Sequence, residues 1–246
     1  MSYQLSRTID YFQSTTDGRI KLDSLVKILQ NAALNHVHEA DRDSRVLIAA
    51  GYAWILNRIR IDILRHPLYG ETLTVRTWHR GARGYKSYRD YEILAGDETV
   101  ALAGSAWLFL DLERRRVVRV PRETNDLYGV NPAAALDHDI EEWRPVKKLD
   151  PEFTVDITTR RSDYDMLGHV NNAAYFDYLD TLMHRFVPEH QALTNVAIQY
   201  NREINGRVDH IRAGIRSDGP GRYPFILYDE SGLYACGEIG TAAAGT

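Results

Sequence analysis

One order of predicted elements, a strand, a helix and then several antiparallel strands, occurs twice in this 246-residue chain. In the first half, apolar residues recur at steps of three and four over residues 22–37, which predicts an amphipathic helix with one face on a sheet. Alternation over 54–63 and 73–78 predicts half-buried strands, and the glycines within 81–84 predict a break. Residues 85–112 predict an antiparallel hairpin. A helix followed by antiparallel strands is typical of an α+β domain.

The second half follows the same plan. Residues 153–158 predict a strand, apolar positions over 176–186 predict a helix that ends before Pro188, and four further strands are predicted within 196–239. Between the two halves the periodicity is lost. We therefore expect two copies of one fold, with these boundaries: an N-terminal domain over 1–122, a linker or crossing segment over 123–150 and a C-terminal domain over 151–246.

The composition is typical of a globular protein in water, with 44% hydrophobic residues, 26% charged residues and a net charge of -4. No apolar run is long enough to span a membrane, and residues 1–8 resemble neither a signal peptide nor a transit peptide. We therefore expect a cytoplasmic protein that does not bind membranes. The mild overall acidity argues against general binding of nucleic acid.

The sequence offers no pattern for a metal or a cofactor. Cys236 is the only cysteine, so neither an internal disulfide nor a cysteine-based zinc cluster can form. His36, His38 and Glu39 are close in sequence, but residues two apart point in different directions on a helix, and we expect all three on the helix surface. We therefore expect a protein without a metal site and without a cofactor.

The polar stretch 162–175 leads directly into the second helix and is the first candidate for a chemical site. It brings Asp163, Asp165 and His169 together, and we expect the helix to begin just behind them. A helix N-terminus carries unpaired N–H groups and partial positive charge, so it can bind an anion or polarise a carbonyl group. Simple helix capping is the alternative role for the two aspartates. The corresponding stretch of the first half, 15–21, lacks the clustered acids and the histidine, so we expect one site per chain.

Two blocks of the sequence resemble the acyl-acyl-carrier-protein (acyl-ACP) thioesterase family of the double hot-dog type, in a form similar to its bacterial members. The first block runs from Trp54 through Trp78, and the second runs from Asp163 to Asn172 and ends in His-Val-Asn-Asn. The order of elements agrees over nearly the whole chain. The resemblance implies a tandem hot-dog fold, in which each half is an antiparallel sheet wrapped around a central helix. It also implies that the first domain binds the acyl chain and that the second carries the catalytic turn.

The resemblance further implies which residues take part in the reaction. It gives catalytic roles to Asp165, His169 and Glu203. The asparagine of the family's catalytic turn falls on Leu167, whose side chain cannot form a hydrogen bond. Its contribution is then either missing here or supplied by the rest of the turn, through backbone or side-chain groups of Gly168, Val170, Asn171 and Asn172. Attack on the thioester by water or by a carboxylate stays open, as does the identity of the carboxylate that takes the proton.

The activity implied by the resemblance is hydrolysis of acyl-ACP to free fatty acid and carrier protein, in fatty-acid biosynthesis. An acyl-CoA thioesterase and a non-catalytic acyl-binding hot-dog protein are the alternatives. The expected partner is the acidic acyl carrier protein, which a basic run could attract; a plain solvated face is the other interpretation of that run. Both a monomer and a homodimer are compatible with the duplicated fold. The run comprises Arg114, Arg115, Arg116, Arg119 and Arg122.

Overall fold

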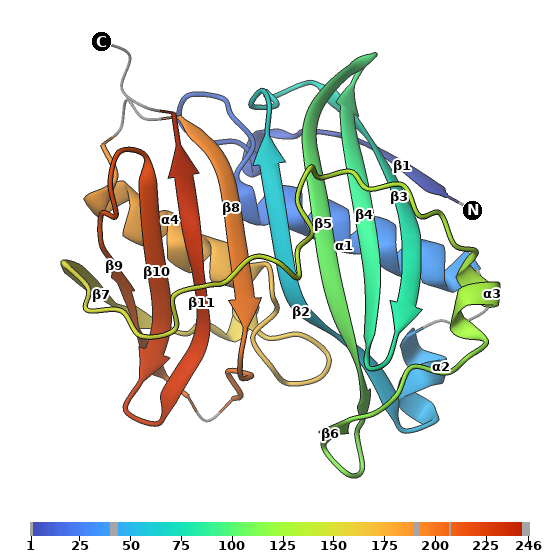
Figure 1. Ribbon diagram of the computed structural model, residues 1–246. Helices are drawn as coiled ribbons and strands as arrows, with labels where there is room; N and C mark the ends of the chain where they lie inside the picture. Colours follow the sequence, from blue (N-terminus) through green and yellow to red (C-terminus); the bar gives the residue numbers. More distant parts are fainter. Residues whose placement is uncertain (1, 40–43, 189–191, 207, 243–246) are drawn as a thin grey trace. The chain divides into compact units, whose positions relative to one another are not determined.

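The computed structural model describes residues 2–39, 44–188, 192–206 and 208–242. The chain divides into two compact units, residues 1–142 and 143–246. Each unit contains an antiparallel sheet with a long helix against one of its faces (Figure 1). No helix in the described ranges is both long and apolar enough to cross a membrane.

The sheet of the first unit has the spatial order β1-β3-β4-β5-β2, with the short strand β6 beside β5. Each of these strands is antiparallel to its neighbours. The elements of this unit are β1 (Tyr3–Thr8), η1 (Tyr11–Gln13), α1 (Leu22–Glu39), α2 (Ser44–Ala49), β2 (Tyr52–Ile63), β3 (Thr72–Arg83), β4 (Lys86–Ala95), β5 (Glu98–Asp111), β6 (Arg116–Val117) and α3 (Thr124–Tyr128).

The apolar stripe of α1 explains why this helix lies on the sheet. Its buried residues recur at three- and four-residue steps, among them Val26, Leu29 and Ala33. The helix contacts β1 and β3, and inward side chains of the sheet such as Val75 and Ile93 are fully buried. Burial of apolar surface contributes about 25 cal/mol per Å² to such packing. The helix predicted over 22–37, the strand predicted over 54–63 and the hairpin predicted over 85–112 are confirmed.

The second unit repeats this arrangement, with the strand order β8-β11-β10-β9-β7 and every neighbour antiparallel. Helix α4 contacts β7 and β9, and its residues Phe176, Leu179 and Leu182 are buried. The predicted strands and the predicted helix of this half are confirmed. The elements are β7 (Phe153–Thr158), η2 (Arg161–Asp163), α4 (Ala174–Phe186), β8 (Leu193–Tyr200), β9 (His210–Ile215), β10 (Arg222–Asp229) and β11 (Gly232–Thr241).

The break predicted over 81–84 is correct only at its end: the chain turns at Gly84, but β3 continues through Gly81 as far as Arg83. A β-bulge lies between His79 and Gly81, and Gly81 has a φ of 117°, which only glycine adopts readily. The glycine therefore marks a bend within a paired strand. The chain turns only after it, and β4 pairs with β3 from Lys86 onward.

Residues 129–142 cross the face of the first sheet opposite α1 (Figure 1). Several hydrogen bonds attach this segment to the strands below it, and two of them hold its middle part. The indole N–H of Trp78 donates to the carbonyl of Ala133 at 2.8 Å, and the backbone N–H of Ala135 donates to Asp90 Oδ2 at 2.8 Å. Leu136 is also buried here. The segment is thus part of the packing of the first unit.

His36 lies in the core of the first unit, so its predicted place on the helix surface is wrong. Arg89 Nη1 donates to His36 Nδ1 at 2.9 Å and to Thr77 Oγ1 at 3.2 Å. Both His36 and Arg89 are only 5% exposed. Burial, with a smaller contribution from the Arg89 charge, lowers the pKa of His36 to about 4. The imidazole is therefore neutral at pH 7 and serves as the acceptor of a buried guanidinium.

Candidate active site

The stretch between η2 and α4 forms a closed loop. Tyr164 and Val170 pair in an antiparallel bridge, and the N–H of Asp165 donates to the carbonyl of His169 at 2.9 Å. Gly168 has a φ of 75°, the left-handed conformation that lets the chain reverse at this point. The loop therefore folds back on itself before the helix, and α4 begins only at Ala174.

The returning arm of this loop pairs with the segment that follows β8. The N–H of Val170 donates to the carbonyl of Ile204 at 2.8 Å, and His169 forms a bridge with Asn205. This pairing brings the His169 imidazole next to the Glu203 carboxylate, with 3.2 Å between Nε2 and Oε2. The two side chains are 34% and 33% exposed, so both remain open to water.

Asp165, the third residue with an implied catalytic role, lies in the same loop. Its Oδ1 accepts the backbone N–H of Leu167 at 2.8 Å, which closes a tight turn around the loop tip. Leu167 itself is 39% exposed at this tip. The structure thus pairs His169 with Glu203 and gives one oxygen of Asp165 to the turn.

The expected helix N-terminus behind Gly168 is wrong, and three of the backbone donors expected there are already used. The N–H of Gly168 donates to the carbonyl of Asp165 at 3.0 Å, that of Val170 to Ile204, and that of Asn171 to Asp163 at 2.7 Å. The physical reason is the loop itself, because its antiparallel pairing consumes the N–H groups that a helix N-terminus would leave unpaired.

The two asparagines at the end of the loop prepare the start of α4. Asn171 Oδ1 accepts the N–H of Ala173 at 2.9 Å, and the carbonyl of Asn172 accepts the hydroxyl of Tyr200 at 3.0 Å. Among the described residues there is no cluster of three histidine, cysteine or acidic side chains placed to bind a metal.

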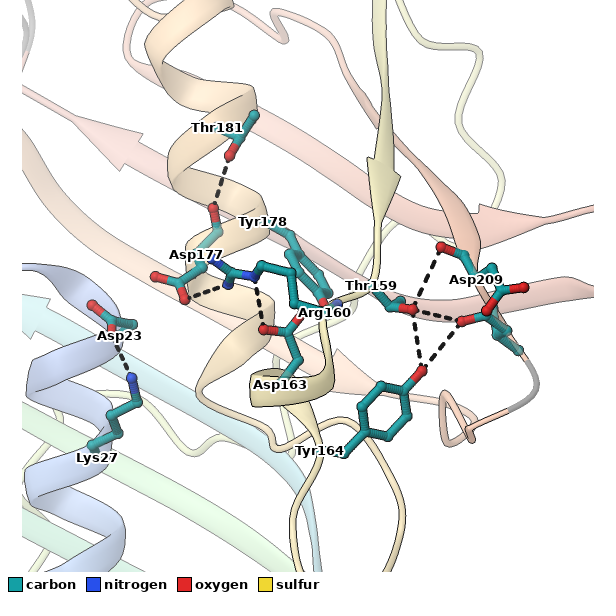
Figure 2. A network of polar contacts seen from close by, with 11 residues as sticks. Asp23, Lys27, Thr159, Arg160, Asp163, Tyr164, Asp177, Tyr178, Thr181 and Asp209 are labelled. Atoms are coloured by element: carbon teal, nitrogen blue, oxygen red, sulfur yellow. Dashed lines mark hydrogen bonds and ion pairs between the residues drawn. The ribbon is translucent and has the colours of Figure 1, made fainter.

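Asp163, predicted either to join the acid cluster of the site or to cap the helix, lies in a buried polar network. Figure 2 shows its carboxylate between Arg160 and Tyr178, and it is 3% exposed. Arg160 also reaches Asp177 on α4 (Figure 2). The sequence did not predict this network, because Tyr178 lies at a position where the helix pattern predicts a buried apolar side chain. A possible signal was the pairing of Arg160 with an acid three residues later.

The corresponding loop of the first unit has the same backbone with different side chains. Residues 11–21 carry the same sequence of turns and bridges as residues 161–171. The N–H of Thr15 donates to the carbonyl of Arg19, as that of Asp165 does to His169. Thr15 thus replaces an acid and Arg19 replaces the histidine. The paired side chains found at His169 and Glu203 belong to the second unit.

Two family models match the sequence of this chain. Models described as the acyl-ACP thioesterase N-terminal domain and C-terminal domain match residues 1–128 and 146–215. The chloroplastic acyl-[acyl-carrier-protein] hydrolase FATB3 of Cuphea viscosissima is 24% identical over 249 residues, which cover 94% of this chain and 60% of that protein. The chain thus spans less than two thirds of the length of this plant relative.

Solved structures confirm the predicted tandem hot-dog fold. An acyl-ACP thioesterase from Bacteroides thetaiotaomicron superimposes with a TM-score of 0.86 at 18% identity, over 98% of each chain. The 12:0-ACP thioesterase from Umbellularia californica gives a TM-score of 0.84 at 18% identity, over 99% of this chain and 98% of that one. With both family models matched in order along the sequence, the chain belongs to the acyl-ACP thioesterase family.

Proposed function

We propose that this protein is a thioester hydrolase that releases free fatty acid from an acylated acyl carrier protein. The observation that carries the proposal is the 3.2 Å contact between His169 Nε2 and Glu203 Oε2, on a loop that leaves both side chains about one-third exposed. Water and a thioester can therefore reach the pair. Membership of the acyl-ACP thioesterase family supports the same reaction.

In the proposed reaction, His169 and Glu203 act together as the general base. A water molecule attacks the thioester carbonyl carbon while the pair takes one of its protons. A proton accepted by either group is stabilised by the other, because they are in direct contact. The tetrahedral intermediate then breaks its C–S bond, and the departing thiolate takes the proton back from the pair. The products are the free acid and the carrier thiol.

Asn172 is the residue that we propose as the donor to the oxyanion. Three backbone N–H groups of the loop are bonded elsewhere, and Leu167 has no donor in its side chain. Asn172 lies three positions after His169 and is partly exposed, and its side-chain amide can donate a hydrogen bond. A preorganised donor of this kind is typically worth about 10²–10³ in kcat. Asp165 supports the site through its bond to the N–H of Leu167.

The decisive experiment is a thiol-release assay of the purified chain with matched acyl-ACP and acyl-CoA substrates. We expect a higher kcat/KM with acyl-ACP, and losses of roughly 10²–10⁴-fold in His169→Ala and Glu203→Gln. We expect a loss of about 10²-fold in Asn172→Ala. His184→Ala, exposed on α4, is the matched control and should keep full activity.

Each alternative has its own signature in this assay. A preference for acyl-CoA would indicate an acyl-CoA thioesterase. Tight acyl binding without release of thiol, by a folded wild-type chain, would indicate an acyl-binding protein. If Glu203→Gln keeps wild-type kcat while His169→Ala loses it, the pair does not act as a unit. Asp165→Asn keeps an oxygen for the N–H of Leu167, so a large loss in that variant would assign a role to its negative charge.

A further inference from the structure

We propose that Asp163, held by Arg160 and Tyr178, is a positioning residue that fixes the loop in the register that joins His169 to Glu203. The proposal rests on the proposed function of that pair and adds Arg160 and Tyr178, for which the sequence predicts no role. Asp163 has no part in bond making. It acts through the main chain of the loop that begins at its own carbonyl group.

The Asp163 carboxylate is buried and accepts hydrogen bonds from three donors. The Tyr178 hydroxyl donates to Oδ2 at 2.6 Å, the Arg160 backbone N–H donates to Oδ2 at 2.8 Å, and Arg160 Nε donates to Oδ1 at 2.9 Å. Arg160 Nη2 also donates to Asp177 Oδ2 at 3.0 Å (Figure 2). One side chain thus ties the end of β7, the turn η2 and the helix α4 together.

The route from this carboxylate to the reacting side chains is short. The carbonyl of Asp163 accepts the N–H of Asn171 at 2.7 Å, which closes the base of the loop. The residue before Asn171 is Val170, whose N–H is bonded to the carbonyl of Ile204, the neighbour of Glu203. A shift of Asp163 would therefore change the pairing that sets the distance between His169 and Glu203.

The first unit provides an internal comparison. At the positions of Asp163, Arg160 and Tyr178 it has Gln13, Asp10 and Ile28, by the shared order of turns and the shared burial pattern of the two helices. Gln13 Oε1 still accepts the N–H of Asp10, at 3.1 Å. The capping bond is therefore kept, but with a neutral acceptor and with an apolar residue on the helix.

This comparison separates a structural role from a positioning role. A buried ion pair commonly adds little net stability relative to apolar or neutral replacements, because desolvation offsets the attraction. The loop of the first unit has the same backbone without the buried carboxylate. The charged network accompanies the loop that carries His169, where a charged acceptor with three donors holds the backbone more tightly than an amide can.

The kinetic test uses Tyr178→Phe and Asp163→Asn in the full chain with acyl-ACP. Tyr178→Phe removes one donor and keeps the ring, so the fold should survive. We expect kcat to fall about tenfold in Tyr178→Phe, and further in Asp163→Asn, with little change in KM. Gln13→Ala removes the equivalent neutral cap of the first unit and should leave kcat unchanged. Wild-type kcat in folded Tyr178→Phe and Asp163→Asn would overturn the proposal.

A second measurement does not depend on hydrolysis. The imidazole nitrogen shifts of His169 in ¹⁵N-labelled protein report its contact with Glu203, and Glu203→Gln gives the reference for the broken contact. We expect Tyr178→Phe and Asp163→Asn to move these shifts toward that reference, and Gln13→Ala to leave them unchanged. Wild-type shifts in both variants would overturn the proposal. If the wild-type chain hydrolyses no thioester, the proposed function fails while the shifts still decide whether Asp163 positions His169. Should Asp163→Asn fail to fold, Tyr178→Phe decides both measurements.

Discussion

At the scale of single residues, the buried contact between His36 and Arg89 makes stability depend on pH. Burial lowers the pKa of His36 to about 4 in the folded chain, against about 6.5 for an exposed histidine. Between these values the unfolded chain binds more protons, so the contribution of His36 is fully present above about pH 6.5 and is lost as the pH falls toward 4. Protonation would also remove the acceptor of Arg89.

Asp90 has the opposite effect on the pH dependence of stability, over part of the same pH range. Burial is the main cause that raises the pKa of its carboxyl group to about 6. Its folded form holds a proton that the unfolded chain has released, so its contribution is present at low pH and is lost as the pH rises through about 6. The stability of the wild-type chain therefore depends on pH through opposing contributions, and a variant is needed to separate them.

We therefore predict a pH-dependent effect of His36→Gln. Glutamine keeps an oxygen that can accept from Arg89 and does not titrate. The free energy of unfolding of wild type minus that of the variant should fall by about 2–3 kcal/mol between pH 7 and pH 4. Urea unfolding at several pH values measures this difference, in which Asp90 cancels. A flat difference for His36→Gln would contradict a neutral buried imidazole.

At the scale of elements, the two equivalent loops allow a matched pair of glycine substitutions. Gly18 and Gly168 have φ values of 79° and 75°, and a Cβ at either position would meet no atom within 4 Å. Alanine at each position should therefore cost only conformational strain, about 1 kcal/mol. We predict similar losses of stability for Gly18→Ala and Gly168→Ala, but a several-fold loss of kcat in Gly168→Ala alone.

Thermal unfolding and the acyl-ACP assay on the same samples check this prediction. Equal losses of kcat in the two variants would indicate a global effect of instability. An unchanged kcat in Gly168→Ala would indicate that the geometry of the loop tip has no influence on the His169–Glu203 pair.

The helices and strands could be predicted from the sequence because each carries a simple periodicity. Local irregularities could not. Gly81 lies in a bulge rather than a turn because β4 continues to pair with β3 around it, a contact between distant residues. The start of α4 was predicted too early because the bond from Val170 to Ile204 draws the preceding residues into a loop. In both cases tertiary pairing overrides the local pattern.

The site residues likewise include some that the local sequence indicates and some whose position depends on tertiary contacts. His169 stands out in the sequence because it lies among acids and asparagines before a helix. Glu203 follows a strand far along the chain, and only the family resemblance pointed to it; its place beside His169 depends on the bridge between His169 and Asn205. Asp163 is also a candidate from the sequence. Its partner Tyr178 is not, because it lies on the buried face of α4, where the pattern predicts only apolar packing.

At the scale of the whole molecule, charge distribution bears on the proposed carrier. The chain has a net charge of -4, so an acidic acyl carrier protein would be repelled on average and needs a local basic surface for attraction. The basic cluster, defined as Arg114, Arg115, Arg116, Arg119 and Arg122, is exposed around the β5–β6 turn and the segment after it. Arg114 Nη1 is paired with Asp111 Oδ2 at 2.9 Å.

We predict that reversing part of this basic cluster weakens the use of acyl-ACP and spares small substrates. Arg119→Glu with Arg122→Glu leaves the β5–β6 turn and its Arg114–Asp111 pair intact. It should raise KM for acyl-ACP several-fold at low salt, because rim charges act mainly on the association rate. With an uncharged acyl-N-acetylcysteamine thioester, kcat/KM should not change. Raising the salt concentration should shrink the difference between wild type and variant, since screening weakens both attraction and repulsion. An unchanged KM for acyl-ACP at low salt would place the carrier elsewhere on the surface.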